Sequence, residues 1–146
     1  FNQNMTVKMS PQIEQILDEG KAGALFYLIE EATNNARKYA EAELITVQGV
    51  IQGESIIIKI ADNGKGFDSD AVNANYDRRG SFGMVNMRER AELLNGTLNL
   101  KSVIGKGTVI TITIPLEVTR MLTNPDKIQR QVNHTKLAVT TRNLKP

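Results

Sequence analysis

The chain has 146 residues, of which 40% are hydrophobic and 23% charged, proportions typical of a folded globular domain. It contains no cysteine, so disulfide bonds, zinc sites built on thiolates and cysteine nucleophiles are excluded. Its apolar runs fall short of the roughly 18 residues that a membrane span needs, and no signal peptide is visible, so we expect a cytoplasmic domain without membrane contact.

The charge is divided unevenly along the chain. Residues 1–116 hold 12 basic and 14 acidic residues, a net charge of −2, whereas residues 117–146 hold six basic and two acidic residues, a net charge of +4. The basic tail has no Phe, Tyr or Trp to stack on bases, so we expect no nucleic acid partner. We therefore predict a domain over residues 1–116 and a basic C-terminal extension over residues 117–146.

The first forty residues predict a strand and two helices. Met5–Met9 alternates apolar and polar residues, which indicates a half-buried strand. Ser10-Pro11 is a good helix start, with serine as the N-cap and proline at the first helical position of a short helix that ends near Gly20. A longer helix is predicted from about Lys21 to Tyr39, because apolar residues recur three and four positions apart at Leu25, Leu28, Ile29, Ala32 and Ala36.

Polar residues interrupt the apolar pattern of this longer helix. Glu31 and Asn35 lie four positions apart and therefore share a face. Asn34 adds a second asparagine next to the first, against the helix propensity of that residue type. Such local violations tend to occur at functional sites, although a solvated helix face without function is the alternative.

Two strands and a polar loop follow. Leu44–Gln52 alternates as a strand, and Gly53-Glu54 is a plausible two-residue turn into the β-branched run Ser55–Ile60, so a hairpin is predicted. The polar run Asp68–Ser81 is typical of a mobile surface loop.

The remaining elements complete an α+β pattern. A helix is predicted over Met84–Leu94, with Asn95-Gly96 as its C-cap, and a last hairpin over Thr97–Ser102 and Thr108–Ile114. Strands joined mostly by hairpins, with helices grouped between them, predict a two-layer α/β sandwich whose mixed, mostly antiparallel sheet carries helices on one face. A short helix from Asn124-Pro125 is the only element expected in the tail.

The loop Asp62-Asn63-Gly64-Lys65-Gly66 follows the apolar run directly. Its glycines allow positive φ or close approach of a ligand to the backbone. A lone carboxylate before such a loop is well placed to accept a hydrogen bond from a small molecule. The alternative is a tight turn with an Asx cap and no ligand.

Four motifs in order along residues 5–116 resemble the ATP-binding domain of the GHKL superfamily. This superfamily, whose fold is the Bergerat type, includes sensor histidine kinases, type II topoisomerases, the Hsp-ninety chaperones and mismatch-repair ATPases. The matching segments are Glu31–Tyr39 for the N box, Asp62–Gly66 for the first glycine box, Gly80–Met84 for the second glycine box, and Gly105–Thr108 for the final glycine–threonine element.

The segment Gly83–Thr97 resembles the histidine kinases within that superfamily. Its Asn86-Met87-Arg88-Glu89-Arg90 run, followed by a glycine and a threonine, is similar to the class that includes the nitrate sensors and the desaturase-control kinases. The chain departs from that class in two of its motifs. Tyr39 stands where a histidine is usual, and Ser81-Phe82 replaces a common glycine or histidine.

The resemblance implies a site for ATP and Mg²⁺. Asp62 would accept a hydrogen bond from the adenine amino group, and Asn35 would present its amide oxygen to Mg²⁺, an ion that prefers oxygen ligands. The lid would be formed by the loop from Asp68 to Gly83, with Arg78 and Arg79 as candidate phosphate contacts. The resemblance assigns further nucleotide contacts to Lys38, Tyr39, Gly64, Gly66, Gly80, Gly83, Met84 and Thr108.

The resemblance also implies a kinase that is incomplete in this chain. Glu31 is the candidate general base that would orient or deprotonate an acceptor imidazole. His134, the single histidine, lies in the tail outside any sequence that resembles a phosphoacceptor helix. Because the chain also begins at Phe1 rather than methionine, we expect a fragment that lacks its histidine-containing dimerisation domain and shows little autophosphorylation alone. A response regulator is the other expected partner.

Two alternatives remain open at this point. One is an anti-sigma-type serine kinase or another GHKL ATPase, which would use the same site with a different acceptor. The other is a degenerate nucleotide-binding or interaction module, favoured by the altered second glycine box and the basic tail. Saturable binding of Mg²⁺–ATP would distinguish the degenerate module from the histidine kinase and from the other GHKL enzymes.

Overall fold

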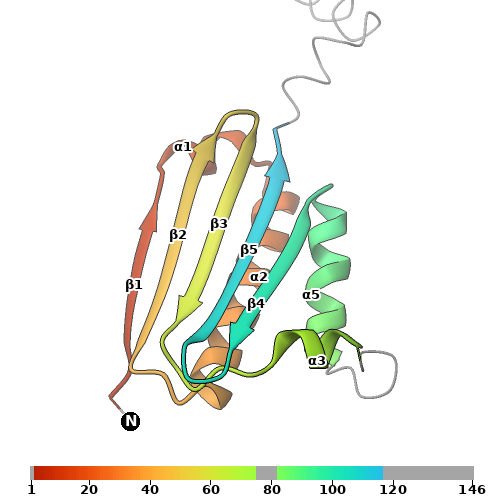
Figure 1. Ribbon diagram of the computed structural model, residues 1–146. Coiled ribbons are helices and arrows are strands. Elements are labelled where there is room, and N and C mark those ends of the chain that lie inside the picture. Colours follow the sequence, from red (N-terminus) through yellow and green to blue (C-terminus); the bar gives the residue numbers. More distant parts are fainter. Residues whose placement is uncertain (1, 75–81, 117–146) are drawn as a thin grey trace, which may run out of the picture. The chain divides into compact units, whose positions relative to one another are not determined.

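The computed structural model describes residues 2–74 and 82–116 of the chain, and Phe1–Pro115 form one compact unit. Figure 1 shows its elements along the chain. They are β1 (Asn4–Met9), α1 (Gln12–Ile16), α2 (Glu19–Tyr39), β2 (Leu44–Gln52), β3 (Ser55–Asp62), α3 (Ser69–Ala74), α5 (Phe82–Leu93), β4 (Thr97–Val103) and β5 (Gly107–Pro115).

The strands form one mixed sheet in the order β1-β2-β3-β5-β4. β1 pairs with β2 in parallel, and the other neighbouring strands pair antiparallel. The predicted hairpins are present: β2 turns into β3 through Gly53-Glu54, and β4 turns into β5 through residues 104–106. The predicted α+β fold with a mostly antiparallel sheet is therefore confirmed.

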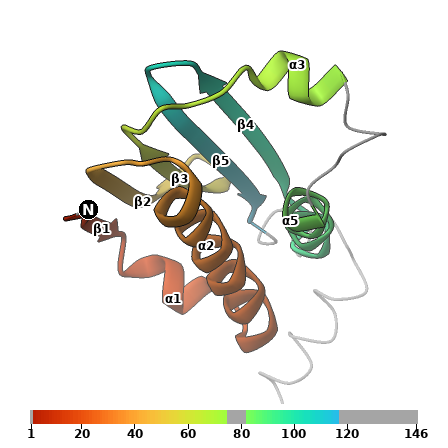
Figure 2. The same cartoon turned by 90° about the horizontal axis from the view of Figure 1, so that it is seen from below.

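The helices α1, α2 and α5 cover one face of this sheet, as Figure 2 shows from below. The central strand β3 contributes Ile56, Ile58 and Ile60 to the core, each no more than 2% exposed. Their spacing of two residues places them on one face, as strand geometry requires. The predicted apolar residues of α2 pack against this face of the sheet. Of them, Ile29 is half-buried, and the rest are buried: Leu25, Leu28, Ala32 and Ala36.

Helices α2 and α5 run in opposite directions (Figure 1) and contact each other. The guanidinium carbon of Arg90 on α5 lies 3.7 Å from the ring centre of Tyr27 on α2, a cation–π contact between the two helices. The C-terminal end of α2, the end of β3, the β4–β5 turn and the start of α5 consequently lie at one end of the sheet, the lower end in Figure 1.

The predicted boundary between the first two helices was wrong. Helix α1 begins at Gln12 with Pro11 as its N-cap and has no side-chain cap, because the Ser10 hydroxyl bonds the Gln12 side chain instead. Gly20 does not end this helix but lies in the first turn of α2. The reason is Asp18, whose Oδ1 accepts a 2.9 Å hydrogen bond from the Lys21 N–H and thereby starts α2 early.

Two further expectations need correction. β1 is exposed along its whole length rather than half-buried, because it is an edge strand and α1 and α2 pack on β2 and β3 instead. The start of the polar loop is helical, since Asp68 Oδ1 accepts hydrogen bonds from the Asp70 and Ala71 N–H groups and caps α3. The predicted C-cap of α5 at Asn95-Gly96 is confirmed, since Asn95 has φ of 53° and the Gly96 N–H donates a 2.9 Å hydrogen bond to the Ala91 carbonyl oxygen. The predicted tail helix lies outside the described residues.

Candidate nucleotide-binding site

Three polar side chains stand side by side at the lower end of the sheet. Asp62 is the last residue of β3 and pairs with Thr108 at the start of β5, which in turn pairs with Ser102 on β4. Each lies two positions along its strand from a core-facing residue, so all three point to the helix-covered face. Ser102 Oγ and Thr108 Oγ1 are 2.8 Å apart. The predicted nucleotide contacts Asp62 and Thr108 are therefore neighbours.

Ser102 is a residue that the sequence analysis did not single out. It is 5% exposed, and its Oγ accepts a 2.9 Å hydrogen bond from the Phe67 N–H. Its hydroxyl also lies 3.1 Å from the Gly107 carbonyl oxygen, which it can donate to. The available signal was the alternation in β4, where Leu98 and Leu100 place the serine on the core-facing side. Ser102 thus joins the glycine loop to the β4–β5 hairpin.

The glycine loop begins with an Asx turn. Asp62 Oδ1 accepts a 2.9 Å hydrogen bond from the Gly64 N–H, which leaves the second oxygen of the half-buried carboxylate for a ligand donor. The turn expected from the alternative interpretation is therefore present, and it holds the carboxylate in place. It is compatible with ligand binding.

Both glycines of this loop are required by neighbouring backbone. A Cβ on Gly64 would lie 2.1 Å from the Ala40 carbonyl oxygen at the end of α2, and a Cβ on Gly66 would lie 2.1 Å from the Val103 carbonyl oxygen. Gly66 also has φ of +58°. The loop is consequently packed between α2 on one side and the β4–β5 turn on the other.

The polar face of α2 carries Asn35, the predicted metal ligand, together with Glu31. Glu31 and Asn35 are both half-buried, which argues against a merely solvated face. Asn35 Nδ2 donates a long hydrogen bond of 3.5 Å to Glu31 Oε1, so the Asn35 amide oxygen is turned away from the carboxylate. The Lys38 and Tyr39 side chains are exposed, and Tyr39 is 67% exposed.

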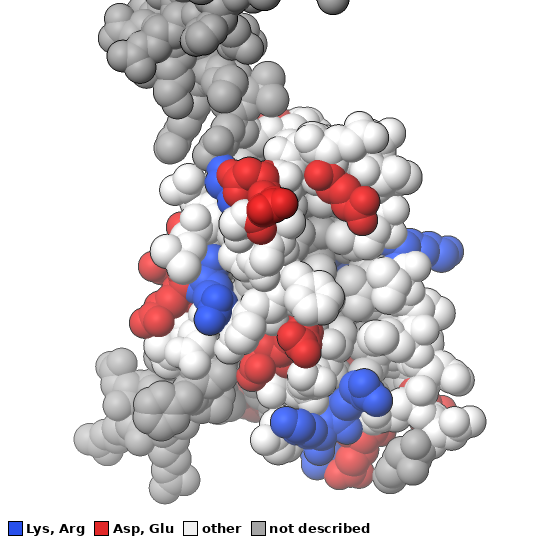
Figure 3. Space-filling model, turned by 180° about the vertical axis from the view of Figure 1, so that it is seen from behind, with Lys and Arg blue, Asp and Glu red and all other residues white. Residues whose placement is uncertain are grey.

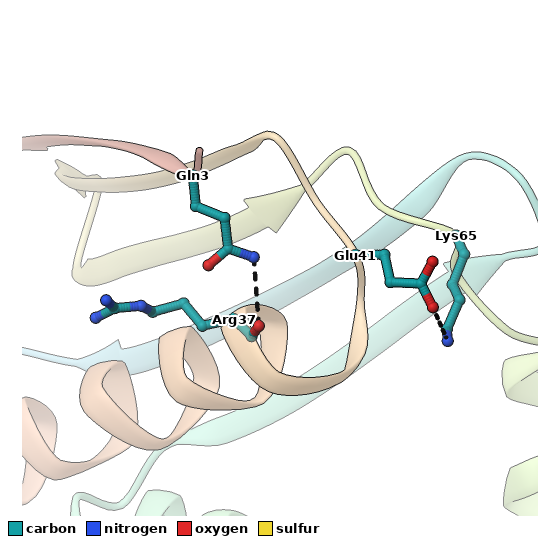
Figure 4. A network of polar contacts seen from close by, with 4 residues as sticks. All are labelled: Gln3, Arg37, Glu41 and Lys65. Carbon is teal, nitrogen blue, oxygen red and sulfur yellow. Dashed lines mark hydrogen bonds and ion pairs between the residues drawn. The ribbon is translucent and has the colours of Figure 1, made fainter. Parts of the chain in front are cut away.

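The C-terminal end of α2 is held by groups from other segments. Gln3 Nε2 donates a 3.3 Å hydrogen bond to the Arg37 carbonyl oxygen, and the Lys65 N–H donates a 2.7 Å hydrogen bond to the Ala40 carbonyl oxygen. The Lys65 ammonium also forms an ion pair of 2.7 Å with Glu41, as Figure 4 shows. Carbonyl groups that a helix end leaves unpaired are thereby satisfied, which fixes the helix end in place.

The second glycine box is described only in part. Gly83 and Met84 lie in the first turn of α5, and the Met84 side chain is half-buried. Gly80 and Ser81 lie outside the described residues, as do the candidate phosphate contacts Arg78 and Arg79.

The side chains of the described residues suit a metal ion that binds together with the phosphates of a nucleotide. Within residues 2–74 and 82–116, no cluster of three or more His, Cys, Asp or Glu side chains is arranged to hold a metal ion. Figure 3 shows basic and acidic groups interspersed over the helix-covered face of the described residues. The Asn35 amide oxygen is a hard donor that fits Mg²⁺, an ion that is often held by one or two protein oxygens together with substrate phosphates.

The fold and site define a member of an ATP-binding family. The family model described as "Histidine kinase-, DNA gyrase B-, and HSP90-like ATPase" matches residues 20–118. The chain therefore belongs to this family, as the four motifs predicted.

Curated relatives narrow the comparison to sensor histidine kinases. The chain is 42% identical over 111 residues to the signal transduction histidine-protein kinase/phosphatase DegS of Bacillus subtilis, covering 76% of this chain and 26% of DegS. It is 46% identical over 96 residues to an uncharacterized sensor-like histidine kinase of Chloroflexus aurantiacus, covering 65% of this chain and 16% of that protein. It is 36% identical over 93 residues to the oxygen sensor histidine kinase NreB of Staphylococcus carnosus, covering 63% of this chain and 25% of NreB.

These relatives indicate the class of histidine kinase and show how much of a relative's length this chain covers. DegS and NreB belong to the nitrate-sensor and DegS-type class, so the predicted resemblance to that class is confirmed. The chain spans about a quarter or less of the length of each of these three relatives. None of the described helices combines the length and apolar character that a membrane span needs.

Solved structures agree on the fold. The blue-light activated histidine kinase of Erythrobacter litoralis superposes with a TM-score of 0.67 at 21% identity, covering 82% of this chain and 37% of that one. The ATP-binding domain of PrrB from Mycobacterium tuberculosis superposes with a TM-score of 0.60 at 21% identity, covering 78% of this chain and 80% of that one. The two-layer arrangement is therefore that of histidine kinase ATP-binding domains.

Proposed function

We propose that this chain is the ATP-binding catalytic domain of a cytoplasmic sensor histidine kinase, or of the cytoplasmic part of a membrane-bound one. It supplies the γ-phosphoryl group of Mg²⁺–ATP to a histidine on a separate dimerisation domain, from which a response regulator receives it. The catalytic domain comprises residues 1–116, and residues 117–146 form an extension. The observation that carries the proposal is the half-buried Asp62 carboxylate, held by the Gly64 N–H beside Thr108 at the sheet end that also holds the end of α2.

Adenine recognition is assigned to Asp62 and its neighbours. The free carboxylate oxygen accepts the adenine amino hydrogen, which guanine cannot supply because it carries a carbonyl at that position. Thr108 contacts the nucleotide from β5, with its hydroxyl held by Ser102 at 2.8 Å. Met84 on α5 packs against the base, and the backbone at Gly64 and Gly66 passes beneath it.

Phosphate and metal binding are assigned to α2 and to the second glycine box. The Asn35 amide oxygen holds Mg²⁺, which neutralises phosphate charge when bound. Lys38, one turn further along α2, pairs with phosphate oxygens, and Tyr39 donates a hydrogen bond to them. The backbone N–H groups at Gly80, Gly83 and the start of α5 bind anionic oxygens.

Glu31 is assigned the role of general base. Its carboxylate is half-buried and accepts the Asn35 amide hydrogen at 3.5 Å, so base and metal ligand are held on one helix face. It would orient the acceptor imidazole or take its proton. Phosphoryl transfer depends mainly on positioning and on charge stabilisation, so Asp62 and Asn35 matter more than Glu31.

Titration with a fluorescent ATP analogue and Mg²⁺ tests the proposal. Asp62→Asn keeps an oxygen for the Gly64 N–H but replaces the other acceptor with a donor, so we expect affinity to fall about 100-fold with the fold intact. Asn35→Ala should weaken binding only when Mg²⁺ is present. Glu54→Gln in the exposed β2–β3 turn is the control for loss of a carboxylate outside the proposed site, and it should bind as the wild type does. Absence of saturable binding by the wild type would refute the proposal.

A further inference from the structure

Asn63, the residue next to the adenine-binding Asp62, turns its side chain towards the connection between α2 and β2. Its Oδ1 accepts two hydrogen bonds, from the Glu43 N–H at 3.0 Å and from the Leu44 N–H at 2.8 Å. Its own N–H donates to the Leu44 carbonyl oxygen at 3.2 Å. One loop residue therefore makes three hydrogen bonds with two consecutive residues of another segment.

The two residues that follow contact the same connection. Gly64 approaches the Ala40 carbonyl so closely that a Cβ would lie 2.1 Å from its oxygen, and the Lys65 N–H donates to that oxygen at 2.7 Å. Glu41, within the connection, has φ of 53°, a conformation that non-glycine residues keep only when their surroundings hold it. Residues 63–65 thus hold residues 40–44 in place, and we call this set of contacts the clamp.

The clamp joins the two halves of the proposed ligand site. Asp62 immediately precedes Asn63, while residues 40–44 continue directly from the end of α2, which carries Asn35 and Lys38. A helix is stiff over one or two turns, so fixing its end at Ala40 also fixes the position of Asn35. The clamp therefore contributes, together with the core packing of α2, to the separation between the base-binding carboxylate and the metal-binding amide.

We infer that Asn63 is a positioning residue for Mg²⁺–ATP binding, acting by holding the end of α2 at a set distance from Asp62. The inference rests on the proposed function, because only a ligand that touches both Asp62 and α2 benefits from a fixed separation. Preorganisation of two contact points strengthens binding of a ligand that spans them. A ligand that reaches Asp62 alone gains nothing from it.

The test compares a spanning ligand with a short one. The non-hydrolysable analogue AMP-PNP with Mg²⁺ spans both parts, whereas adenosine reaches only the base-binding part, and both are titrated by NMR. In Asn63→Ala we expect the affinity for Mg²⁺–AMP-PNP to fall about tenfold and that for adenosine to change less than about twofold. Asn99→Ala, an exposed asparagine on β4, is the matched control and should leave both affinities unchanged.

Asn63→Asp separates positioning from direct contact. Its carboxylate can accept the same two N–H groups, so we expect Mg²⁺–AMP-PNP affinity within about threefold of wild type at about 0.15 M salt, where the added charge is screened. Amide hydrogen exchange supplies a direct readout: the Glu43 and Leu44 N–H groups should exchange about tenfold faster in Asn63→Ala and at the wild-type rate in Asn63→Asp.

Several results would overturn the inference. Equal loss for both ligands in Asn63→Ala would show that Asn63 acts on the base-binding part alone, and unchanged binding would show that it positions nothing. A folded Asn63→Asp that binds the analogue as poorly as the alanine variant would point to direct contact by the amide, and this variant decides the matter if Asn63→Ala does not fold. Wild-type protein that fails to bind Mg²⁺–AMP-PNP would instead refute the proposed function.

Discussion

The two ends of the sheet use glycine for different purposes. At the upper end in Figure 1, Gly53 forms the β2–β3 turn with φ of +58°, and a Cβ placed there would meet nothing within 4 Å. At the lower end, Gly66 has the same φ, but its Cβ would lie 2.1 Å from the Val103 carbonyl oxygen. The upper glycine only permits a turn. The lower one permits three backbone segments to pack together around the proposed site.

The largest expected effect on the free energy of unfolding comes from replacing Gly53 or Gly66 by alanine. Gly53→Ala should destabilise the protein by about 1–2 kcal/mol, the cost of a left-handed conformation for an L-residue. Gly66→Ala adds an overpacking cost of about 1–3 kcal/mol to the same conformational cost. Urea unfolding of the two variants measures the difference. Equal destabilisation of the two variants would show that the close backbone contact at Gly66 adds no cost to the alanine substitution.

A smaller effect is expected from serine to alanine changes at the two ends. Ser102→Ala removes the acceptor of the Phe67 N–H from a 5% exposed position, and we expect a loss of about 1–3 kcal/mol. Ser55 begins β3 at the upper end and is half-buried, so Ser55→Ala should stay within about 0.5 kcal/mol. The comparison fails if thermal unfolding ranks these two variants in the opposite order.

The smallest effect is expected from the surface ion pair at the lower end. The Lys65 and Glu41 side chains are each 60% exposed, so their ion pair is screened by solvent. Lys65→Gln should therefore change the free energy of unfolding by less than about 0.5 kcal/mol and keep the backbone bond to Ala40. A loss of about 2 kcal/mol would mean that the ion pair, rather than the backbone contacts, holds the loop to α2.

The parts of the fold that the sequence predicted are those with a regular pattern of apolar residues. The apolar residues of α2 and the β-branched run of β3 mark one buried face each, which is why both elements and the sheet could be predicted. Helix starts were less predictable, because the sequence does not show which polar residue caps α2, and only the folded chain shows that Asp18 accepts the Lys21 N–H. The exposure of β1 could not be predicted, because alternation does not reveal which strands the helices cover.

The site was predictable as a set of motifs but not as a structure. Asp62 and Asn35 stood out because polar residues follow or interrupt apolar runs. The roles of Asn63 and Ser102 depend on contacts between segments 19 to 35 positions apart in the chain, which no local pattern contains. The glycines of the first box are explained as much by Ala40 and Val103 as by a ligand.

The most direct test of the central claim is a map of amide chemical shifts on addition of Mg²⁺–AMP-PNP to the uniformly ¹⁵N-labelled protein. We expect saturable changes at Asn35, Asp62 and Thr108, and none at Gly53 or Ser55, because the ligand binds at the lower end of the sheet. Changes centred on the β2–β3 turn, or no saturable change anywhere, would contradict the assignment of an ATP site to Asp62 and α2.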